Sequence, residues 1–494
     1  MKKQIITIQP LGKKIEVNYN TSLIDVLHEF GVEFPCGGAG TCGKCKVKIL
    51  EGSVQKSSKH QQKLEFLGLS DEWRLACDSN VIADITIEIE QFSNLILADE
   101  SEFEFTAQKG FGIAVDLGTT TIVAQLIELS TAKVLAVEKR INPQVKFGAD
   151  LISRIQATLD GHLPEMTKII RETIGAMIDL MIAAGKVEVR KVVIVGNTVM
   201  HHIFCGYDLT GLSAYPFISE RLAAEKFKTK DLNWNFDPEE DIIFYPSIGS
   251  FVGSDILAGI VATGLHQKEK YTALIDLGTN GEIVVGNNKH IVCASTAAGP
   301  AFEGYNISMG MRAVTGAISS INLVDNMLIT NVIGNVEPKG ICGSALIDAI
   351  ATLRALNKID TLSEILSGEN SIQIAGNVSI IQKDITEFQF AKAAIAAGLK
   401  ILAKNLNIKL EDIEQVYIAG GFGSYINLEH VVQVGMIELP EEKIKKMGNT
   451  ALIGAKMFLF NDFEICNHIL VNCKHINLEE DTDFQDTYID KLYF

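Results

Sequence analysis

Four cysteines near the amino terminus fall in a pattern that can hold a metal cluster. Three lie in the segment PCGGAGTCGKC with the spacing C-x5-C-x2-C, and the fourth follows in RLAC after 31 further residues. They are Cys36, Cys42, Cys45 and Cys77. Four thiolates in such an arrangement are typical ligands of a [2Fe-2S] cluster. The glycines between them let the backbone pass close to inorganic sulfide and direct its amides at the negative cluster.

A structural zinc site is the competing interpretation. Zinc sites usually combine two C-x2-C pairs, whereas this segment has one such pair, Cys42 and Cys45, beside a longer glycine loop. The spacing therefore favours iron and sulfide. The remaining five cysteines are scattered along the chain, and we expect them to be inert, partly buried thiols.

Two acidic, glycine-containing turns indicate a nucleotide site. The segments GIAVDLGTTTIVAQLIEL (112–129) and TALIDLGTNGEIVVGNN (272–288) each contain an apolar strand, then Asp-Leu-Gly-Thr, then a second apolar strand. Amides and hydroxyls of such turns can face phosphate oxygens, and two aspartates can hold Mg2+ through waters. One turn alone is weak evidence because Asp and Gly are common in turns, but two copies in register favour a phosphate clasp. The candidate residues are Asp116, Gly118, Thr119, Thr120 and Thr121 in the first copy, and Asp276, Gly278, Thr279, Asn280 and Gly281 in the second.

A third glycine-rich turn lies in VYIAGGFGSYINLEHVV, where a strand leads into Gly420, Gly421, Gly423 and Ser424 before a helix. A backbone without side chains can lie flat against adenine or ribose. An ordinary strand-to-helix turn explains this segment equally well when it is taken alone.

The elements that must position these residues form two kinds of unit. Residues 1–92 read as a small α+β domain, with strand-like QIITIQ, KIEVNY and ADITIEIE and a short helix in SLIDVLHEFG. The stretch 93–109 is a polar, acidic linker. Residues 110–494 read as a duplicated α/β assembly of two subdomains, the second beginning near residue 265, which face each other across a cleft.

Composition excludes some classes of partner. The chain has 494 residues and a formal net charge of -17, which repels nucleic acid and anionic lipid at long range. No apolar run reaches the roughly 18 residues of a membrane span, and the amino terminus has no signal-peptide core. We therefore expect a soluble, cytoplasmic protein with no nucleic-acid or membrane partner.

Two resemblances connect these motifs to known folds. The cysteine pattern and its first gap of five residues resemble the adrenodoxin-like variant of the [2Fe-2S] ferredoxins, which implies a β-grasp fold and Cys36, Cys42, Cys45 and Cys77 as ligands. Plant-type centres of this kind lie near about -400 mV, so a one-electron carrier is implied. The order of the loops, two for phosphate and then one for adenosine, resembles the actin, Hsp70 and sugar kinase (ASKHA) superfamily, which implies ATP, Mg2+ and hinge closure.

The combination, including STAAGPAFEGYNI and YIAGGFGSYIN, resembles the reductive activators of corrinoid enzymes over nearly the whole chain. The resemblance implies an ATP-hydrolysing electron-transfer enzyme that converts a Co(II) corrinoid to Co(I) in a partner corrinoid protein or cobalamin-dependent methyltransferase. It also implies an upstream low-potential electron donor, and a homodimer stays open. Because Asp116 follows Cys77 by only 39 positions, we expect a short variant without the middle domain of longer members.

Two other functions stay open at this point. A small-molecule kinase with an accessory cluster would need a catalytic carboxylate near the γ-phosphate and would form ADP in response to substrate. A redox-sensing, ATP-dependent chaperone or assembly factor would transfer no electron to any acceptor.

Overall fold

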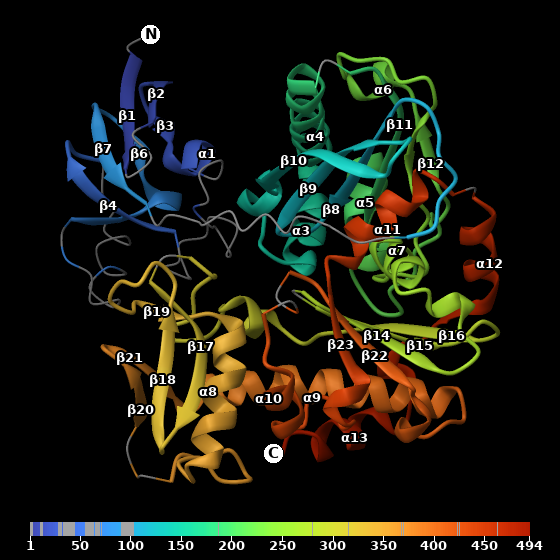
Figure 1. The fold of residues 1–494 in the computed structure, drawn as a ribbon. Coiled ribbons are helices and arrows are strands. Elements are labelled where there is room, and N and C mark those ends of the chain that lie inside the picture. Colours follow the sequence, from blue (N-terminus) through green and yellow to red (C-terminus); the bar gives the residue numbers. More distant parts are fainter. Residues whose placement is uncertain are drawn as a thin grey trace.

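The computed structural model describes residues 3–9, 13–27, 32, 45–54, 64, 70, 72–89, 103–185, 187–278, 280–314, 316–366, 368, 370–421, 423, 425–461 and 463–494. A small β-sheet domain at the amino terminus lies beside a larger body in which sheets and helices are stacked (Figure 1). We call residues 3–89 the ferredoxin domain, after the family that its cysteine pattern resembles, residues 111–268 the first lobe and residues 270–494 the second lobe.

The ferredoxin domain is built on a five-stranded sheet. Its central strands β1 (Lys3–Gln9) and β7 (Ile85–Glu88) pair in parallel, and alternating apolar residues such as Ile6 and Ile8 face a buried core. The predicted strands and the predicted helix start are confirmed. The other described elements are β2 (Lys13–Asn18), β3 (Thr21–Ser22), α1 (Leu23–Leu27), β4 (Lys46–Glu51), β5 (Trp73–Leu75), η2 (Ala76–Asp78) and β6 (Asn80–Val81). Across the sheet the order is β2-β1-β7-β4-β5.

The first lobe contains a six-stranded sheet in the order β10-β9-β8-β11-β13-β12. Its first three strands form an antiparallel meander, and the next two join in parallel. The strands are β8 (Phe111–Leu117), β9 (Thr121–Glu128), β10 (Lys133–Ile141), β11 (Val189–Gly196), β12 (Glu225–Phe227) and β13 (Ile242–Phe244). The helical elements are η3 (Pro143–Lys146), α3 (Leu151–Ala157), η4 (Thr158–His162), α4 (Leu163–Gly185), α5 (Thr198–Cys205), η5 (Thr210–Leu212), α6 (Thr229–Leu232), α7 (Ser254–Ala262) and η6 (Leu265–Gln267).

The second lobe repeats this plan in the order β23-β22-β14-β15-β16-β24. Its main strands are β14 (Thr272–Leu277), β15 (Gly281–Gly286), β16 (Ile291–Thr296), β22 (Gln415–Ala419), β23 (Ile444–Gly448) and β24 (Cys473–His475). Two small sheets are added, β17 (Ala317–Val324) with β18 (Met327–Val332) and β19 (Gly340–Ile341), and β20 (Ser371–Ala375) with β21 (Val378–Ile381). The helical elements are η7 (Pro300–Glu303), α8 (Gly343–Ala355), α9 (Gln382–Asn405), η8 (Leu410–Asp412), α10 (Leu428–Gln433), η9 (Glu441–Lys443), α11 (Thr450–Phe458), α12 (Glu464–Asn472), η10 (Leu478–Glu480) and α13 (Phe484–Asp490).

The two large sheets share a five-stranded core. With the edge strands β12 and β24 left out and the other five strands numbered along each lobe, both cores read 3-2-1-4-5, with the first three strands antiparallel and the fourth and fifth parallel to the first. The two Asp-Leu-Gly-Thr turns therefore occupy the same place in both lobes, after the first strand of each sheet. The duplication that the sequence predicts is present in the fold.

Helices α7 and α11 form the layer between the two sheets. One apolar cluster joins them to Val193 and Val195 of the first sheet and to Leu274 and Val284 of the second. The helices cross closely, because a Cβ added at Gly454 would lie 2.1 Å from the carbonyl oxygen of Ala258. The outer faces of the sheets are covered by α4 and α5 in the first lobe and by α8 and α9 in the second (Figure 1).

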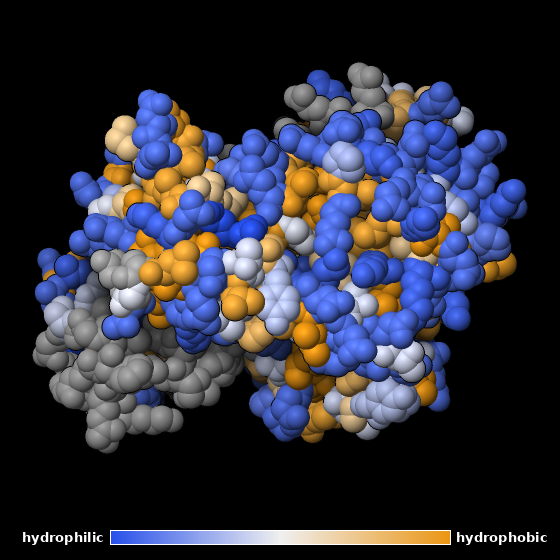
Figure 2. Space-filling view, turned by 90° about the horizontal axis from the view of Figure 1, so that it is seen from below, coloured by the Kyte–Doolittle hydropathy of each residue, from blue (hydrophilic) through white to orange (hydrophobic). Residues whose placement is uncertain are grey.

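The surface mixes polar and apolar residues. On the face seen in Figure 2 the apolar residues form small groups between polar ones. Within the described ranges, no helix has both the length and the apolar character needed to cross a bilayer. The expectation of no membrane partner stays a prediction.

Candidate functional site

The ferredoxin domain places two of the four predicted cluster ligands side by side. Cys45 directly precedes β4 and Cys77 lies in η2, which follows β5, the antiparallel partner of β4. Their Sγ atoms are 3.2 Å apart, well beyond the roughly 2.05 Å of a disulfide bond. Cys36 and Cys42 lie outside the described residues.

Two thiols in contact, without a bond between them, suit two ligands of one metal ion. Cys45 is 1% exposed and belongs to the apolar core of the domain, and Cys77 packs against that core. The surroundings are thus apolar, as expected around a buried Fe-S centre whose potential depends on solvent exposure. The described part of the donor set fits a [2Fe-2S] cluster.

The first predicted phosphate loop, residues 118–121, is held in place through its carbonyl oxygens. Asn142 donates from Nδ2 to the Gly118 oxygen (2.9 Å) and from its backbone N–H to the Thr120 oxygen (2.9 Å). Arg154 donates from Nη2 to the Thr119 oxygen at 2.5 Å. Asn142 and Arg154 are both fully buried, so these contacts fix the shape of the loop.

This anchoring determines where the loop amides point. In a trans peptide the carbonyl and the following N–H point in opposite directions. Since the carbonyls of residues 118–120 face Asn142 and Arg154, the amides of residues 119–121 face away from them. Three successive amides on one side form the kind of nest that binds an anion.

The second loop has a corresponding turn after β14. The Gly278 N–H donates to the Asn280 oxygen at 3.0 Å, and β15 begins at Gly281. A Cβ at Gly281 would lie 2.1 Å from the terminal methyl of Ile395 in α9, so a larger residue there would require the Ile395 side chain to move. Thr279 lies outside the described residues.

The third loop lies against the second one. β22 pairs in parallel with β14, so that Ala419 is the register partner of Asp276. Gly420 has a φ of +91°, and a Cβ there would lie 2.8 Å from Oδ1 of Asp276. Gly421 and Gly423 follow in the same turn, whereas Ser424 lies outside the described residues. The structure thus brings the two predicted loops of the second lobe together.

Four partly buried carboxyl groups gather between the two lobes. Burial raises the pKa of Asp116 to about 6 and, helped by the charge of Asp116, that of Asp276 to about 7. Burial, with the charges of Asp276 and Asp116, raises the pKa of Asp255 to about 8. Burial, and then Asp255 and Asp276, also raise the pKa of Glu282. Perturbed carboxyls that act on one another mark a candidate functional site.

These carboxyl groups do not form a ready-made metal cage. Among the residues that the structure describes, no three His, Cys, Asp or Glu side chains are close enough to hold a metal ion. Asp116 accepts a hydrogen bond from Asn449 Nδ2 at 2.8 Å, which ties it to the start of α11.

Sequence reasoning missed several of the residues at this site. Asp255, Glu282 and Asn449 are absent from the predicted set; Asp255 lies in the first turn of α7, and Asn449 is the residue before α11. Glu282 directly follows the second glycine turn, and that position was the available signal. No local sequence pattern points to Asn142 or Arg154, because the loop residues that they bind lie 24 and 35 positions away in the sequence.

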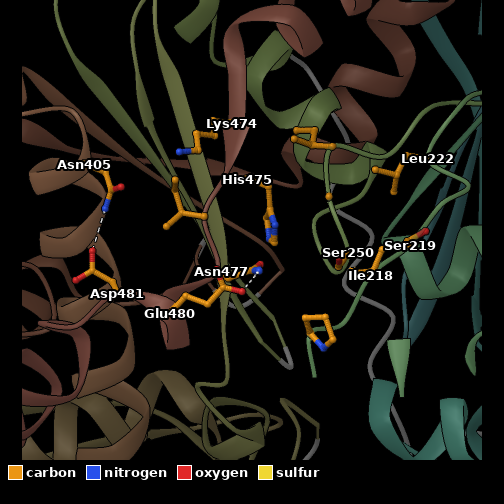
Figure 3. A pocket seen from close by; sticks show the side chains of 14 residues that line it. Ile218, Ser219, Leu222, Ser250, Asn405, Lys474, His475, Asn477, Glu480 and Asp481 are labelled. Carbon is orange, nitrogen blue, oxygen red and sulfur yellow. Dashed lines mark hydrogen bonds between the residues drawn. The ribbon is translucent and has the colours of Figure 1, made fainter. Parts of the chain in front are cut away.

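A separate cavity of about 460 Å³ lies between the lobes (Figure 3). Ser219 and Ser250 of the first lobe and His475 and Glu480 of the second are among its lining residues. His475 packs over Gly249, where a Cβ would meet the imidazole ring at 2.5 Å. None of the predicted nucleotide residues lines this cavity, so it is distinct from the loops described above.

Comparison with known proteins gives the family. Three family models match successive parts of the chain: the 2Fe-2S iron-sulfur cluster binding domain (residues 6–81), the RACo middle region (111–268) and the C-terminal domain of RACo, the ASKHA domain (270–494). The corrinoid activation enzyme RamQ of Eubacterium limosum is 34% identical over 418 residues, which are 78% of this chain and 70% of RamQ. This chain belongs to the corrinoid reductive activators.

A further relative and a solved structure support the assignment to the corrinoid reductive activators. The [Co(II) methylated amine-specific corrinoid protein] reductase of Methanosarcina barkeri is 26% identical over 420 residues, 78% of this chain and 77% of that reductase. A solved structure of a reductive activator for corrinoid, iron-sulfur protein covers 99% of this chain and 98% of its own, with 27% identity and a TM-score of 0.68. The predicted fold class, a ferredoxin domain followed by an ASKHA-type domain, is confirmed.

One expectation about this activator family was wrong. The sequence led us to expect a short variant without a middle domain, yet the middle-region model matches residues 111–268. Asp116 lies inside the middle region, so the short distance from Cys77 to Asp116 does not indicate a missing domain. The middle region is the first lobe itself, whose sheet begins with β8 at Phe111.

Proposed function

We propose that this chain is an ATP-dependent reductive activator. It passes one electron from a reduced [2Fe-2S] cluster to the Co(II) corrinoid of a partner protein, and the cobalt becomes Co(I). The proposal rests on one combination: the Cys45–Cys77 thiol pair and glycine loops around Asp116 and Asp276 occur in one chain, whose named relatives activate or reduce corrinoid proteins. The kinase and chaperone alternatives are not favoured.

The chain's own residues hold the redox centre and shield it. When bound, the [2Fe-2S] cluster supplies a reversible one-electron couple. Cys45 and Cys77 hold one side of it, and Cys36 and Cys42 are proposed as the remaining ligands. Each Co(I) formed requires one electron, so an upstream low-potential donor must return one electron to the cluster in every cycle.

The nucleotide is proposed to lie between the lobes. The amides of residues 119–121 and the turn at residues 278–281 would bind its phosphates, with Thr279 included. Asp116 and Asp276 would hold Mg2+ through waters. Gly420, Gly421, Gly423 and Ser424 would border the adenosine. Residues 110–494 would then work as one ATPase-type unit joined to residues 1–92 by the linker 93–109.

Nucleotide energy has a clear use in such a reaction. Reduction of Co(II) to Co(I) is unfavourable from a cluster near about -400 mV, so a second process must favour the product. A nucleotide that binds one arrangement of the lobes more tightly than another shifts their equilibrium by its differential affinity. The partner that responds to this shift is proposed to be a corrinoid protein or a cobalamin-dependent methyltransferase.

The decisive test is anaerobic. Reduced, cluster-loaded protein is mixed with candidate Co(II) corrinoid proteins, with and without Mg-ATP, and the absorption of Co(I) is followed. We expect Co(I) to accumulate only when ATP is present. ATP-independent reduction would remove the nucleotide from the proposal, and no reduction of any corrinoid protein, by a protein with an intact cluster, would refute it.

A further inference from the structure

One short segment contacts both the first phosphate loop and the ferredoxin domain. It comprises Ile141, the last residue of β10, and the following residues through Lys146, which include η3. We call residues 141–146 the junction segment. In Figure 1 the end of β10 and α3 are the part of the first lobe nearest to the ferredoxin domain.

On its inner side the junction segment holds the phosphate loop. Asn142 is fully buried and bonds the carbonyl oxygens of Gly118 and Thr120, each at 2.9 Å. Ile141 is the direct cross-strand partner of Thr121 in the β9–β10 pair. A change in the shape of this loop therefore acts on the junction segment through two adjacent residues, Ile141 and Asn142.

On its outer side the junction segment packs against the ferredoxin domain. Val145 is only 6% exposed, and it belongs to the apolar cluster whose other described members all come from residues 6–89. Ile141 also packs against that cluster. The same cluster contains Cys45 and contacts Cys77, so the junction touches the core that carries the thiol pair.

Buried polar contacts make the junction segment rigid. Gln144 is fully buried, donates from Nε2 to the Met166 oxygen at 3.1 Å, and accepts from Arg154 Nη1 at 3.3 Å. Arg154 also bonds the Thr119 oxygen. Loop, segment and α3 thus form one hydrogen-bonded unit in a poorly solvated environment, where losing a partner leaves an unsatisfied buried group.

We propose that Asn142 and Val145 are positioning residues. They couple the packing of the ferredoxin domain against the first lobe to the conformation of the first phosphate loop. This inference rests on the proposed function, because it requires a nucleotide at that loop. Nucleotide binding changes the loop, Asn142 moves the junction segment with it, and Val145 changes its contact with the ferredoxin core. The coupling is reciprocal: loosening the ferredoxin contact changes nucleotide affinity by the same factor.

The test uses the full, cluster-loaded chain and Mg-AMPPNP, a non-hydrolysable ATP analogue. Hydrogen exchange of the amides in β1 and β7 is measured with and without nucleotide, and nucleotide affinity is measured by calorimetry. We expect nucleotide to change this exchange in the wild type. Val145→Ser should abolish that response and change nucleotide affinity by about 5-fold or more. The backbone of Val145 makes no hydrogen bond to any of the predicted nucleotide residues.

Two further variants complete the test. Leu135→Ser is the matched control, since Leu135 lies on the same strand β10 but is 46% exposed; it should leave both measurements unchanged. Asn142→Ala should weaken nucleotide binding and also abolish the exchange response in β1 and β7. If either variant proves unfolded by circular dichroism, the other still tests the coupling.

The outcomes separate this inference from the proposed function. Wild-type protein that binds nucleotide and forms Co(I), but shows the same exchange in β1 and β7 with and without nucleotide, would overturn the coupling alone. If nucleotide changed the exchange of β1 and β7 in Val145→Ser as much as in the wild type, the coupling would likewise be overturned. Protein that binds no nucleotide would overturn both.

Discussion

Asp255 illustrates how a single buried carboxyl sets a pH dependence. Its pKa is raised to about 8 from an ordinary value of 3.8, first by burial and then by Asp276 and Asp116. Between these two pH values the folded protein keeps the proton and the unfolded chain does not. Unfolding then releases a proton, so the free energy of unfolding falls as pH rises from about 4 to about 8.

We therefore predict that Asp255→Asn stabilises the nucleotide-free, Mg2+-free protein at pH 8. Each pKa unit corresponds to about 1.4 kcal/mol, and we expect a gain of about 1 kcal/mol or more at pH 8, shrinking towards pH 5. Thermal melting across this pH range measures it. Glu172→Gln, at an exposed position of α4, is the control and should show no such trend. A constant difference between Asp255→Asn and wild type would contradict the prediction.

The thiol of Cys77 gives a second test at this scale. Cys77→Ser removes one of the two sulfur atoms that lie 3.2 Å apart. We predict loss of the [2Fe-2S] absorption and of electron delivery while nucleotide is still bound, because the nucleotide loops belong to other cores. Visible spectra and calorimetry measure the two properties. Cys205→Ser, in the first lobe, should keep the full cluster spectrum; a normal spectrum in Cys77→Ser would refute this ligand.

At the scale of elements, α7 and α11 cross closely near the site. α11 carries Asn449 at its start, which bonds Asp116, and α7 carries Asp255 in its first turn. Gly454 and Ala258 approach so closely that any side chain at Gly454 meets backbone. The geometry of the crossing therefore sets the positions of the acidic residues.

We predict that Gly454→Ala destabilises the protein by about 1–3 kcal/mol, the usual effect of overpacking, and weakens Mg-nucleotide binding. Denaturant midpoints and calorimetry test the two effects. Gly185→Ala, at the end of α4, is the matched control: a Cβ there meets only side chains, at 3.3 Å. It should change stability by less than about 0.5 kcal/mol. Equal effects of the two variants would show that the crossing is not tight.

The same elements show what sequence could and could not predict. Strand-then-turn patterns located Asp116, Asp276 and Gly420, because local residue types determine such turns. The residues that hold the turns from behind, Asn142 and Arg154, depend on tertiary contacts and have no local pattern. The middle region was misjudged for a similar reason: the domain border was inferred from spacing, whereas a sheet beginning at β8 defines it.

For the whole molecule, the separation of cores has a thermodynamic consequence. From the first lobe, only Val145 belongs to the described ferredoxin core, and Ile141 packs against it. The two lobes have their own apolar clusters, and one of these clusters joins the two lobes through α7 and α11. Domains with separate cores tend to unfold separately, so one melting temperature does not describe such a protein.

We predict two calorimetric transitions in the cluster-loaded protein. Removing the cluster should lower the transition of the ferredoxin domain, because ligand binding is linked to folding. Mg-ATP at 100 times its dissociation constant should stabilise the lobes by about 2.7 kcal/mol and raise the other transition. A single transition that responds equally to both treatments would contradict this assignment.

The distant pairing of β24 with β16 bears on how the protein is made. Cys473 is the register partner of Ile291. α11, which begins at Thr450, packs between two sheets whose first strands begin much earlier in the chain, at Phe111 and Thr272. At roughly 5–20 residues per second, the ribosome needs many seconds to supply these pieces, whereas the amino-terminal domain has emerged long before. A nascent chain can therefore receive iron and sulfide while the lobes proposed to bind nucleotide are still being synthesised.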